Sequence, residues 1–149
     1  MNKKGFTLIE LLIVVAIIGI VAAIAIPNLL TALQKGKQKA TMGDIKSIGT
    51  AVESYITDMS IAPEDILNSP DYLVPFHIKK MPPADGWGFA WQYARDAANL
   101  DIYSIGSGGR DGSVVVWSQY GQYVVSSLSG FDLDIIFSNG SFVYGPKTK

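Results

Sequence analysis

The chain has 149 residues, which is about the length of a single domain. Its 12 basic and 13 acidic residues give a formal net charge of -1, so there is no bulk attraction to nucleic acid or to an anionic membrane surface. The sequence contains no cysteine, which excludes disulfides, thiol nucleophiles and cysteine-ligated metals. An exported location stays open, but a domain there would have to be stable without disulfides.

An apolar segment near the N-terminus is the first strong pattern. Residues 11–26 have the sequence LLIVVAIIGIVAAIAI, without a polar side chain. Together with residues 6–10 they would form a helix about 30 Å long, which matches the hydrocarbon thickness of a bilayer. Residues 6–26 are therefore predicted to form a membrane-spanning helix. The carboxylate of Glu10 is the exception within it.

Three interpretations of this segment account differently for Glu10. A removable secretory signal fits Lys3, Lys4 and the small residues around Ile24, but it gains nothing from a carboxylate. A plain membrane anchor fits the hydropathy and also leaves the carboxylate unexplained. In the third, the helix is retained and Glu10 pairs with a positive group of another chain, because the segment itself has no basic residue. Lysines flank both sides of the segment, so their distribution alone does not fix the topology.

A second helical pattern follows the apolar segment. After Pro27, apolar residues recur every three or four positions and predict an amphipathic helix over residues 27–60, with one face made for a soluble core: Ile45, Ile48, Val52, Tyr55, Ile56 and Met59. A continuous helix from Phe6 to about Met59 would be roughly 80 Å long. Gly19 and Pro27 predict a weak stretch that could kink or melt, because glycine costs helix stability and proline removes a backbone donor.

The N-terminal motif resembles the signature of the type IV pilin and pseudopilin superfamily. The stretch GFTLIE (residues 5–10) is followed by the apolar run and by IPN (residues 26–28). In that superfamily a prepilin peptidase cleaves after the glycine and methylates the new N-terminal amine. The resemblance implies cleavage between Gly5 and Phe6 and N-methylation of Phe6. The glutamate of the family corresponds to Glu10, which is implied to neutralise the terminal amine of a neighbouring subunit.

Physical chemistry supports such a pair independently. An ammonium and a carboxylate among apolar helices are each costly alone, so each is penalised strongly if it is left without a partner. The resemblance further implies a cleaved leader, residues 1–5, and a helix that first lies in lipid and later in a filament core. It also implies three kinds of protein partner: the peptidase, an inner-membrane assembly platform, and minor pseudopilins or pilins.

The remaining residues, 61–149, change from helical to strand patterns. Pro63 and four later prolines break the chain up to residue 83, although residues 63–67 could form a short helix. Strands are predicted at residues 89–93 and 101–106, and Asn139-Gly140 between two apolar runs predicts a hairpin. The expected fold is α+β and pilin-like, with the long helix packed on three or four antiparallel strands.

Motifs in this region are similar in order and spacing to the major pseudopilin of type II secretion systems. They are DGWG at residues 85–88, then Tyr93, DIYSIG at 101–106 and GRDG at 109–112. That family usually has a proline after the first aspartate and Asn-Pro after the tryptophan-glycine pair, where this chain has Gly86 and Phe89-Ala90.

Major pseudopilins also bind calcium in the loop after this point. The resemblance therefore implies a structural Ca²⁺ with Asp111 as a ligand and Asp132 or Asp134 as another. Carboxylates and carbonyls suit calcium, but a site needs six to eight oxygen ligands. Turn aspartates in solvent are the alternative, and residues 113–130 are longer than the loop of the family.

Other candidates for chemistry are weaker. His77 is the only histidine and has apolar neighbours, and no serine, cysteine or carboxylate is placed to complete a catalytic relay. The paired Asp132 and Asp134 fit a turn or a cation site as well as hydrolysis. The glycines of residues 106–112 lack the lysine and helix of a phosphate loop and predict a tight turn. The three tryptophans are core or interface anchors, because few basic residues accompany them.

The sequence thus predicts a filament subunit and not an enzyme. It would be held in the bacterial inner membrane by a single helix, with its globular domain in the periplasm. We favour the major pseudopilin of a type II secretion system, which would help a short periplasmic filament to drive export. A type IV pilin of a surface pilus is the alternative, followed by a monomeric membrane-tethered binding module.

Overall fold

The computed structural model describes residues 5–147, so residues 1–4 of the predicted leader lie outside the described part of the chain. The described chain falls into two compact units, which meet between Gln34 and Lys35. Helix α1, Leu8–Met59, contributes to both of them. Its bounds agree closely with the helix predicted from Phe6 to Met59.

The N-terminal unit is an uncovered apolar helix. From Leu8 to Leu33 its large hydrophobic side chains are between 44% and 76% exposed, and it is long and apolar enough to cross a membrane. The helix is unbroken at Gly19 and Pro27. Around the proline, the Asn28 side-chain amide donates to the carbonyl of Ile24 (3.1 Å) and the Thr31 hydroxyl donates to the carbonyl of Pro27 (3.0 Å).

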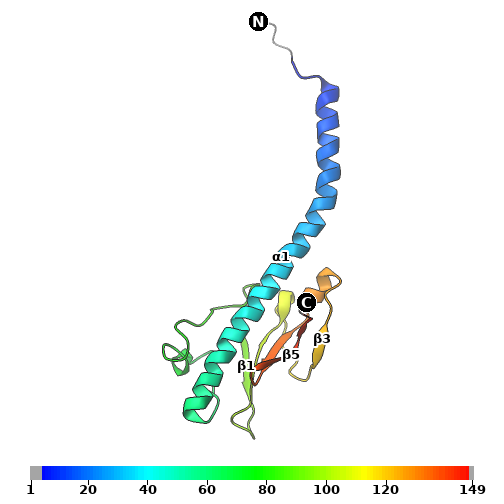
Figure 1. Ribbon diagram of the computed structural model, residues 1–149. Helices are drawn as coiled ribbons and strands as arrows, with labels where there is room; N and C mark the ends of the chain where they lie inside the picture. Colours follow the sequence, from blue (N-terminus) through cyan, green and yellow to red (C-terminus); the bar gives the residue numbers. More distant parts are fainter. Residues whose placement is uncertain (1–4, 148–149) are drawn as a thin grey trace. The chain divides into compact units, whose positions relative to one another are not determined.

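The C-terminal unit packs the second part of α1 on a five-stranded sheet, and Figure 1 shows the sheet beside this part of the helix. The strand order is β1-β2-β4-β5-β3. The bounds are Gln92–Arg95 for β1, Tyr103–Ser107 for β2, Gly121–Tyr123 for β3, Ile135–Ser138 for β4 and Ser141–Pro146 for β5. Three short 3₁₀ helices lie in the connections: η1 Pro70–Tyr72, η2 Gly109–Asp111 and η3 Leu128–Phe131.

The predicted α+β, pilin-like class is confirmed, but the expected sheet of three or four antiparallel strands is wrong in two details. The sheet has five strands, and β3 pairs with β5 in parallel. The additional strand has only three residues, of which two are exposed, so it carries no alternating pattern. The first strand was also placed too early, since β1 starts at Gln92 rather than residue 89. Residues 63–67 form no helix. There the carboxylate of Asp65 accepts the backbone N–H of Leu67 (2.8 Å), and this closes a turn instead.

The core of this unit confirms the amphipathic pattern of α1. Ile45, Ile48 and Val52 are fully buried against side chains of β2 and β4. Gly49 lies on the same face, where an added Cβ would overlap the ring of Phe137. The helix needs a glycine here because its backbone approaches the sheet so closely.

Residues with positive φ lie at the end of α1 and in the turn between β4 and β5, close to where the sequence predicts a helix end and a hairpin. Ser60, with φ of 61°, ends α1 and donates its N–H to the carbonyl of Ile56 (2.7 Å). Asn139 and Gly140, with φ of 45° and 82°, join β4 to β5. The predicted Asn-Gly hairpin is therefore confirmed, since a two-residue loop with both central residues at positive φ is what this dipeptide favours.

Candidate functional site

The start of α1 carries the predicted processing and assembly residues. Gly5 and Phe6 lie in irregular chain before the helix, and the Phe6 side chain is 82% exposed. The bond between them is therefore outside regular structure. Residues 1–4 of the leader are not among the described residues, so cleavage and methylation stay predictions.

Glu10 forms a capping box with Thr7. Oε2 of Glu10 accepts the backbone N–H of Thr7 (2.8 Å) and the Thr7 hydroxyl (2.7 Å), while the hydroxyl oxygen of Thr7 accepts the N–H of Glu10 (3.3 Å). Threonine before the first helical residue, with glutamate three positions later, satisfies free N–H groups of the helix start reciprocally. The T-x-x-E spacing of TLIE was visible in the sequence, but Thr7 was not recognised as a partner of Glu10.

The DGWG motif fastens the chain after the proline-rich segment to the core. Asp85 is 6% exposed. One carboxylate oxygen accepts the N–H groups of Trp87 and Phe89 (both 2.9 Å), and the other accepts the Ser107 hydroxyl at the end of β2 (2.6 Å). Such a buried carboxylate with several donors holds the turn of residues 85–89 against the end of β2.

The similar family usually has a proline where this chain has Gly86, and the contacts of Gly86 explain the difference. Its N–H donates to Oγ1 of Thr41 on α1 (2.9 Å), which a proline could not do. A Cβ at Gly86 would also overlap the carbonyl of Lys37. The glycine therefore docks this turn directly on the helix.

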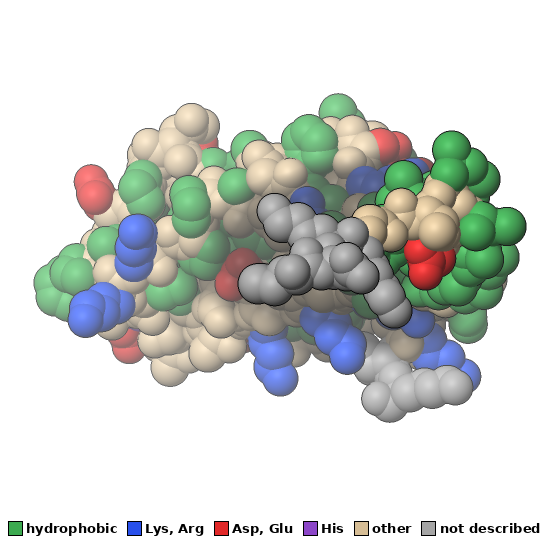
Figure 2. Space-filling model, turned by 90° about the horizontal axis from the view of Figure 1, so that it is seen from above, with side chains coloured by type: hydrophobic (Ala, Val, Ile, Leu, Met, Phe, Trp, Pro, Cys, Tyr) green, Lys and Arg blue, Asp and Glu red, His purple; other side chains and the backbone are tan. Residues whose placement is uncertain are grey.

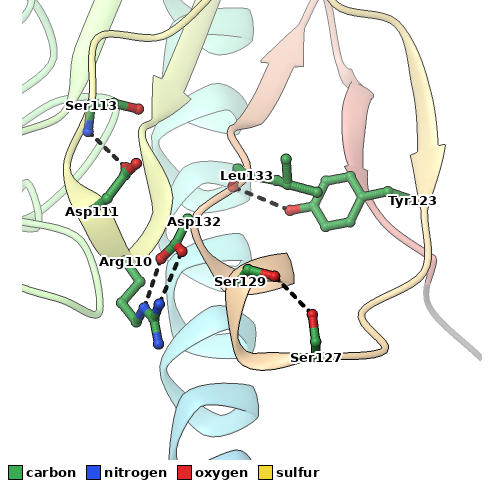
Figure 3. Close-up of polar contacts among 8 residues, drawn as sticks. All are labelled: Arg110, Asp111, Ser113, Tyr123, Ser127, Ser129, Asp132 and Leu133. Atoms are coloured by element: carbon green, nitrogen blue, oxygen red, sulfur yellow. Dashed lines mark hydrogen bonds and ion pairs between the residues drawn. The ribbon is translucent and has the colours of Figure 1, made fainter.

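The loop that was predicted to hold calcium is closed by an ion pair. Nε of Arg110 donates to Oδ1 of Asp132 (2.7 Å) and Nη2 donates to Oδ2 (2.9 Å), as Figure 3 shows. This bidentate geometry is the strong form of an arginine–carboxylate pair, and it raises the pKa of Arg110. It joins η2 to the residue that follows η3. We call it the Arg110–Asp132 clasp.

The two other aspartates of the predicted calcium set each accept a backbone hydrogen bond. Asp111 accepts the N–H of Ser113 (3.0 Å; Figure 3), and Asp134, which is 5% exposed, accepts the N–H of Val116 (2.9 Å). Burial raises the pKa of Asp134, and the nearby charge of Asp111 raises it further. Within residues 5–147, no three histidine, cysteine, aspartate or glutamate side chains are gathered closely enough to hold a metal ion. Calcium binding by these aspartates stays a prediction.

The remaining candidates have structural surroundings. Nδ1 of His77 lies 3.0 Å from the Ser54 hydroxyl and 3.9 Å from a carboxylate oxygen of Asp58. The glycine-rich stretch forms the tight turn that was predicted, with Gly109 and Gly112 at φ of 70° and 64°. Trp91 is buried in the core, and its indole N–H donates to the carbonyl of Pro82 (2.9 Å).

Comparisons with known proteins place these features in a family. The prokaryotic N-terminal methylation motif matches residues 1–26. The family described as type II secretion system (T2SS), protein G, matches residues 28–119, more than half of the chain. The chain belongs to the protein G family of type II secretion systems. This family consists of structural pseudopilin subunits.

Relatives within the protein G family are similar over most of their length. The type II secretion system core protein G of Vibrio cholerae is 31% identical over 141 residues, which cover 85% of this chain and 96% of that protein. The corresponding protein of Pseudomonas aeruginosa is 32% identical, over 74% of this chain and 88% of that protein. The type IV major pilin protein PilA of Myxococcus xanthus is 51% identical, but over only 38% of this chain and 26% of that protein. No solved structure matches the chain.

Proposed function

We propose that this chain is the structural subunit of a helical filament of the type IV pilus family, and that it acts as the major pseudopilin of a type II secretion system. The observation that carries this proposal is a carboxylate at the start of an uncovered apolar helix, in a chain of the protein G family. Exposed apolar surface of this extent needs lipid or other apolar helices, and Glu10 needs a positive partner there.

The N-terminal amine created by cleavage after Gly5 would supply that partner. It would sit on Phe6, at the exposed start of the same helix in a neighbouring copy. Before assembly, the helix would hold the chain in the inner membrane with the C-terminal unit in the periplasm. Other partners would be the prepilin peptidase, the assembly platform and the minor pseudopilins. The role is structural, without a catalytic step by this chain.

Two substitutions separate the pairing role of Glu10 from its capping role. Glu10→Ala removes both, whereas Thr7→Val removes only the hydroxyl that donates to Oε2. We expect Glu10→Ala to abolish filaments in electron micrographs of the isolated periplasmic fraction, and Thr7→Val to assemble nearly as well as the wild type. Equal loss in both variants would show that the cap, and not an intermolecular pair, is what assembly needs.

Mass spectrometry of the purified protein tests the processing. We expect a mature chain that begins at Phe6 and carries one added methyl group. A chain that begins after Ile26, or that keeps Met1, would overturn the prepilin assignment.

A surface pilus is the second candidate, because the similarity to PilA of Myxococcus xanthus is high where it exists. Deletion of the gene distinguishes the two. Loss of an exported protein from the culture medium, with its retention in the periplasm, supports the secretion role. Loss of surface filaments with intact export would favour the pilin.

A further inference from the structure

The C-terminal unit carries a groove between α1 and the edge of the sheet. It has a volume of about 670 Å³. Its lining combines apolar side chains with three lysines: Met42, Val124, Val125 and Pro146, with Lys35, Lys39 and Lys147, besides Gln38. Val124 is 73% exposed. We call this surface the lysine groove.

The lysine groove combines positive charge with apolar surface. Gln38 within it is only 6% exposed, and its side chain interacts with the phenol of Tyr123. The three lysines supply positive charge, and Met42 and Val124 supply apolar contacts. The groove therefore suits an occupant with an apolar side chain and acidic groups.

The same unit also carries a surface around Phe76 that is apolar and acidic, and therefore complementary to the lysine groove. This side chain is 90% exposed, which is unusual for a phenylalanine in a folded domain. It borders a hollow of about 490 Å³ that also includes Tyr72 and the carboxylates of Asp58 and Asp71. We call this surface the Phe76 knob. Lys79 and Lys80 follow in the sequence but do not line the hollow.

The lysine groove and the Phe76 knob lie at opposite ends of the unit. Asp58 is about 28 Å further along α1 than Lys39, at 1.5 Å per residue. Figure 1 shows the end of α1 near Met59 on the side of the unit away from β3. Figure 2 shows several lysine and arginine side chains along the lower edge of its view. One copy can therefore present its knob to the groove of the next.

We propose that the Phe76 knob of one copy docks in the lysine groove of a second copy. Phe76 would contact the apolar floor formed by Met42 and Val124, while Asp58 and Asp71 would face the lysines. Because the two surfaces differ, the contact is heterologous, and repeated heterologous contacts generate an open helical chain rather than a closed dimer. This inference rests on the proposed function, since it assigns the contact between globular units of a filament.

Cross-linking in assembled filaments tests the contact. Because the sequence contains no cysteine, only the introduced cysteines can react with the cross-linker. Ser126→Cys lies beside the groove and Met59→Cys lines the hollow of the knob. With a flexible bismaleimide, we expect a ladder of covalent multimers from the double variant and only monomers from each single variant. Dimers from a single variant would reveal a symmetric contact and overturn the proposal. Ala97→Cys with Ser126→Cys is the matched control and should give no ladder.

Charge reversal tests the pairing itself. In the double-cysteine background, Lys39→Glu should reduce the ladder by about tenfold through like-charge repulsion. A further Asp71→Lys in the same chain should restore the ladder. Failure to restore it, with filaments still visible, would overturn the proposed contact.

The failure of this inference is distinguishable from failure of the proposed function. Wild-type filaments in electron micrographs without a ladder from the double variant would overturn the contact and leave the filament role intact. A wild-type chain that forms no filaments at all would overturn both.

Discussion

Replacement by alanine is expected to change the stability of the protein differently at two glycines in the second half of α1. An added Cβ at Gly49 would overlap the ring of Phe137, which is 3% exposed and contacts Phe142 edge-on at 5.1 Å between ring centroids. At Gly43 an added Cβ would meet nothing within 4 Å. Replacement of glycine by alanine in a helix interior gains roughly 0.8–1.0 kcal/mol from helix propensity alone.

The expected magnitudes follow from this difference in space. Gly43→Ala should stabilise the protein by about 1 kcal/mol. Gly49→Ala gains the same propensity but must displace Phe137, and overpacking of a well-packed core costs typically 1–3 kcal/mol. Since the propensity gain is common to both variants, the difference between them, about 1–3 kcal/mol, measures the tightness of the helix–sheet contact.

Urea unfolding of the full-length protein in detergent provides the measurement. Tryptophan fluorescence reports on the C-terminal unit, because all three tryptophans lie between residues 87 and 117. We expect the midpoint of Gly43→Ala above that of the wild type and the midpoint of Gly49→Ala below that of Gly43→Ala. Equal increases in both variants would refute the close approach of α1 to the sheet at Gly49.

Four further predictions concern the polar contacts of the C-terminal unit. Asp85→Ala should destabilise the protein by about 3 kcal/mol in the same unfolding assay, because two backbone N–H groups and the Ser107 hydroxyl lose their acceptor; a near-neutral effect would contradict this network. Arg110→Gln should lower the thermal midpoint in dilute buffer, and 1 M NaCl should shrink the difference, because the clasp is partly exposed and therefore screened. Addition of calcium, followed by a chelator, should leave the thermal midpoint of the wild type unchanged. A clear rise of the midpoint with calcium would support the predicted metal site. Asp134→Asn should stabilise the protein at neutral pH and not at acidic pH: burial raises the pKa of Asp134 in the folded state, so its favourable contribution exists at low pH and is lost as the pH rises through the folded pKa.

The helix and the hairpin could be predicted because each has a local cause. The three- and four-residue spacing of Ile45, Ile48 and Val52 fixes a helix face, and Asn139-Gly140 favours one turn geometry. By contrast, β3 is held by pairing with β5, which is distant in the sequence, and its three residues have no pattern of their own. Its parallel direction is a property of the assembled sheet.

The candidate site divides in the same way. Gly5, Phe6 and Glu10 belong to one contiguous motif, so the sequence alone is enough to predict a role for them. The aspartate set stays a prediction, because residue type does not show which partner a carboxylate will take. Asp132 binds Arg110, which is 22 positions earlier in the chain. The sequence does not show that these two side chains lie close together in the fold. The clasp is a product of tertiary packing.

The capping box at the start of α1 also fixes which part of Glu10 a second chain can reach. Both hydrogen bonds from Thr7 within the same chain end on Oε2 of Glu10. A carboxylate has about four acceptor positions over its two oxygens, so these bonds leave Oε1 for a donor of another chain. The threonine thus orients the carboxylate before a neighbouring ammonium meets it.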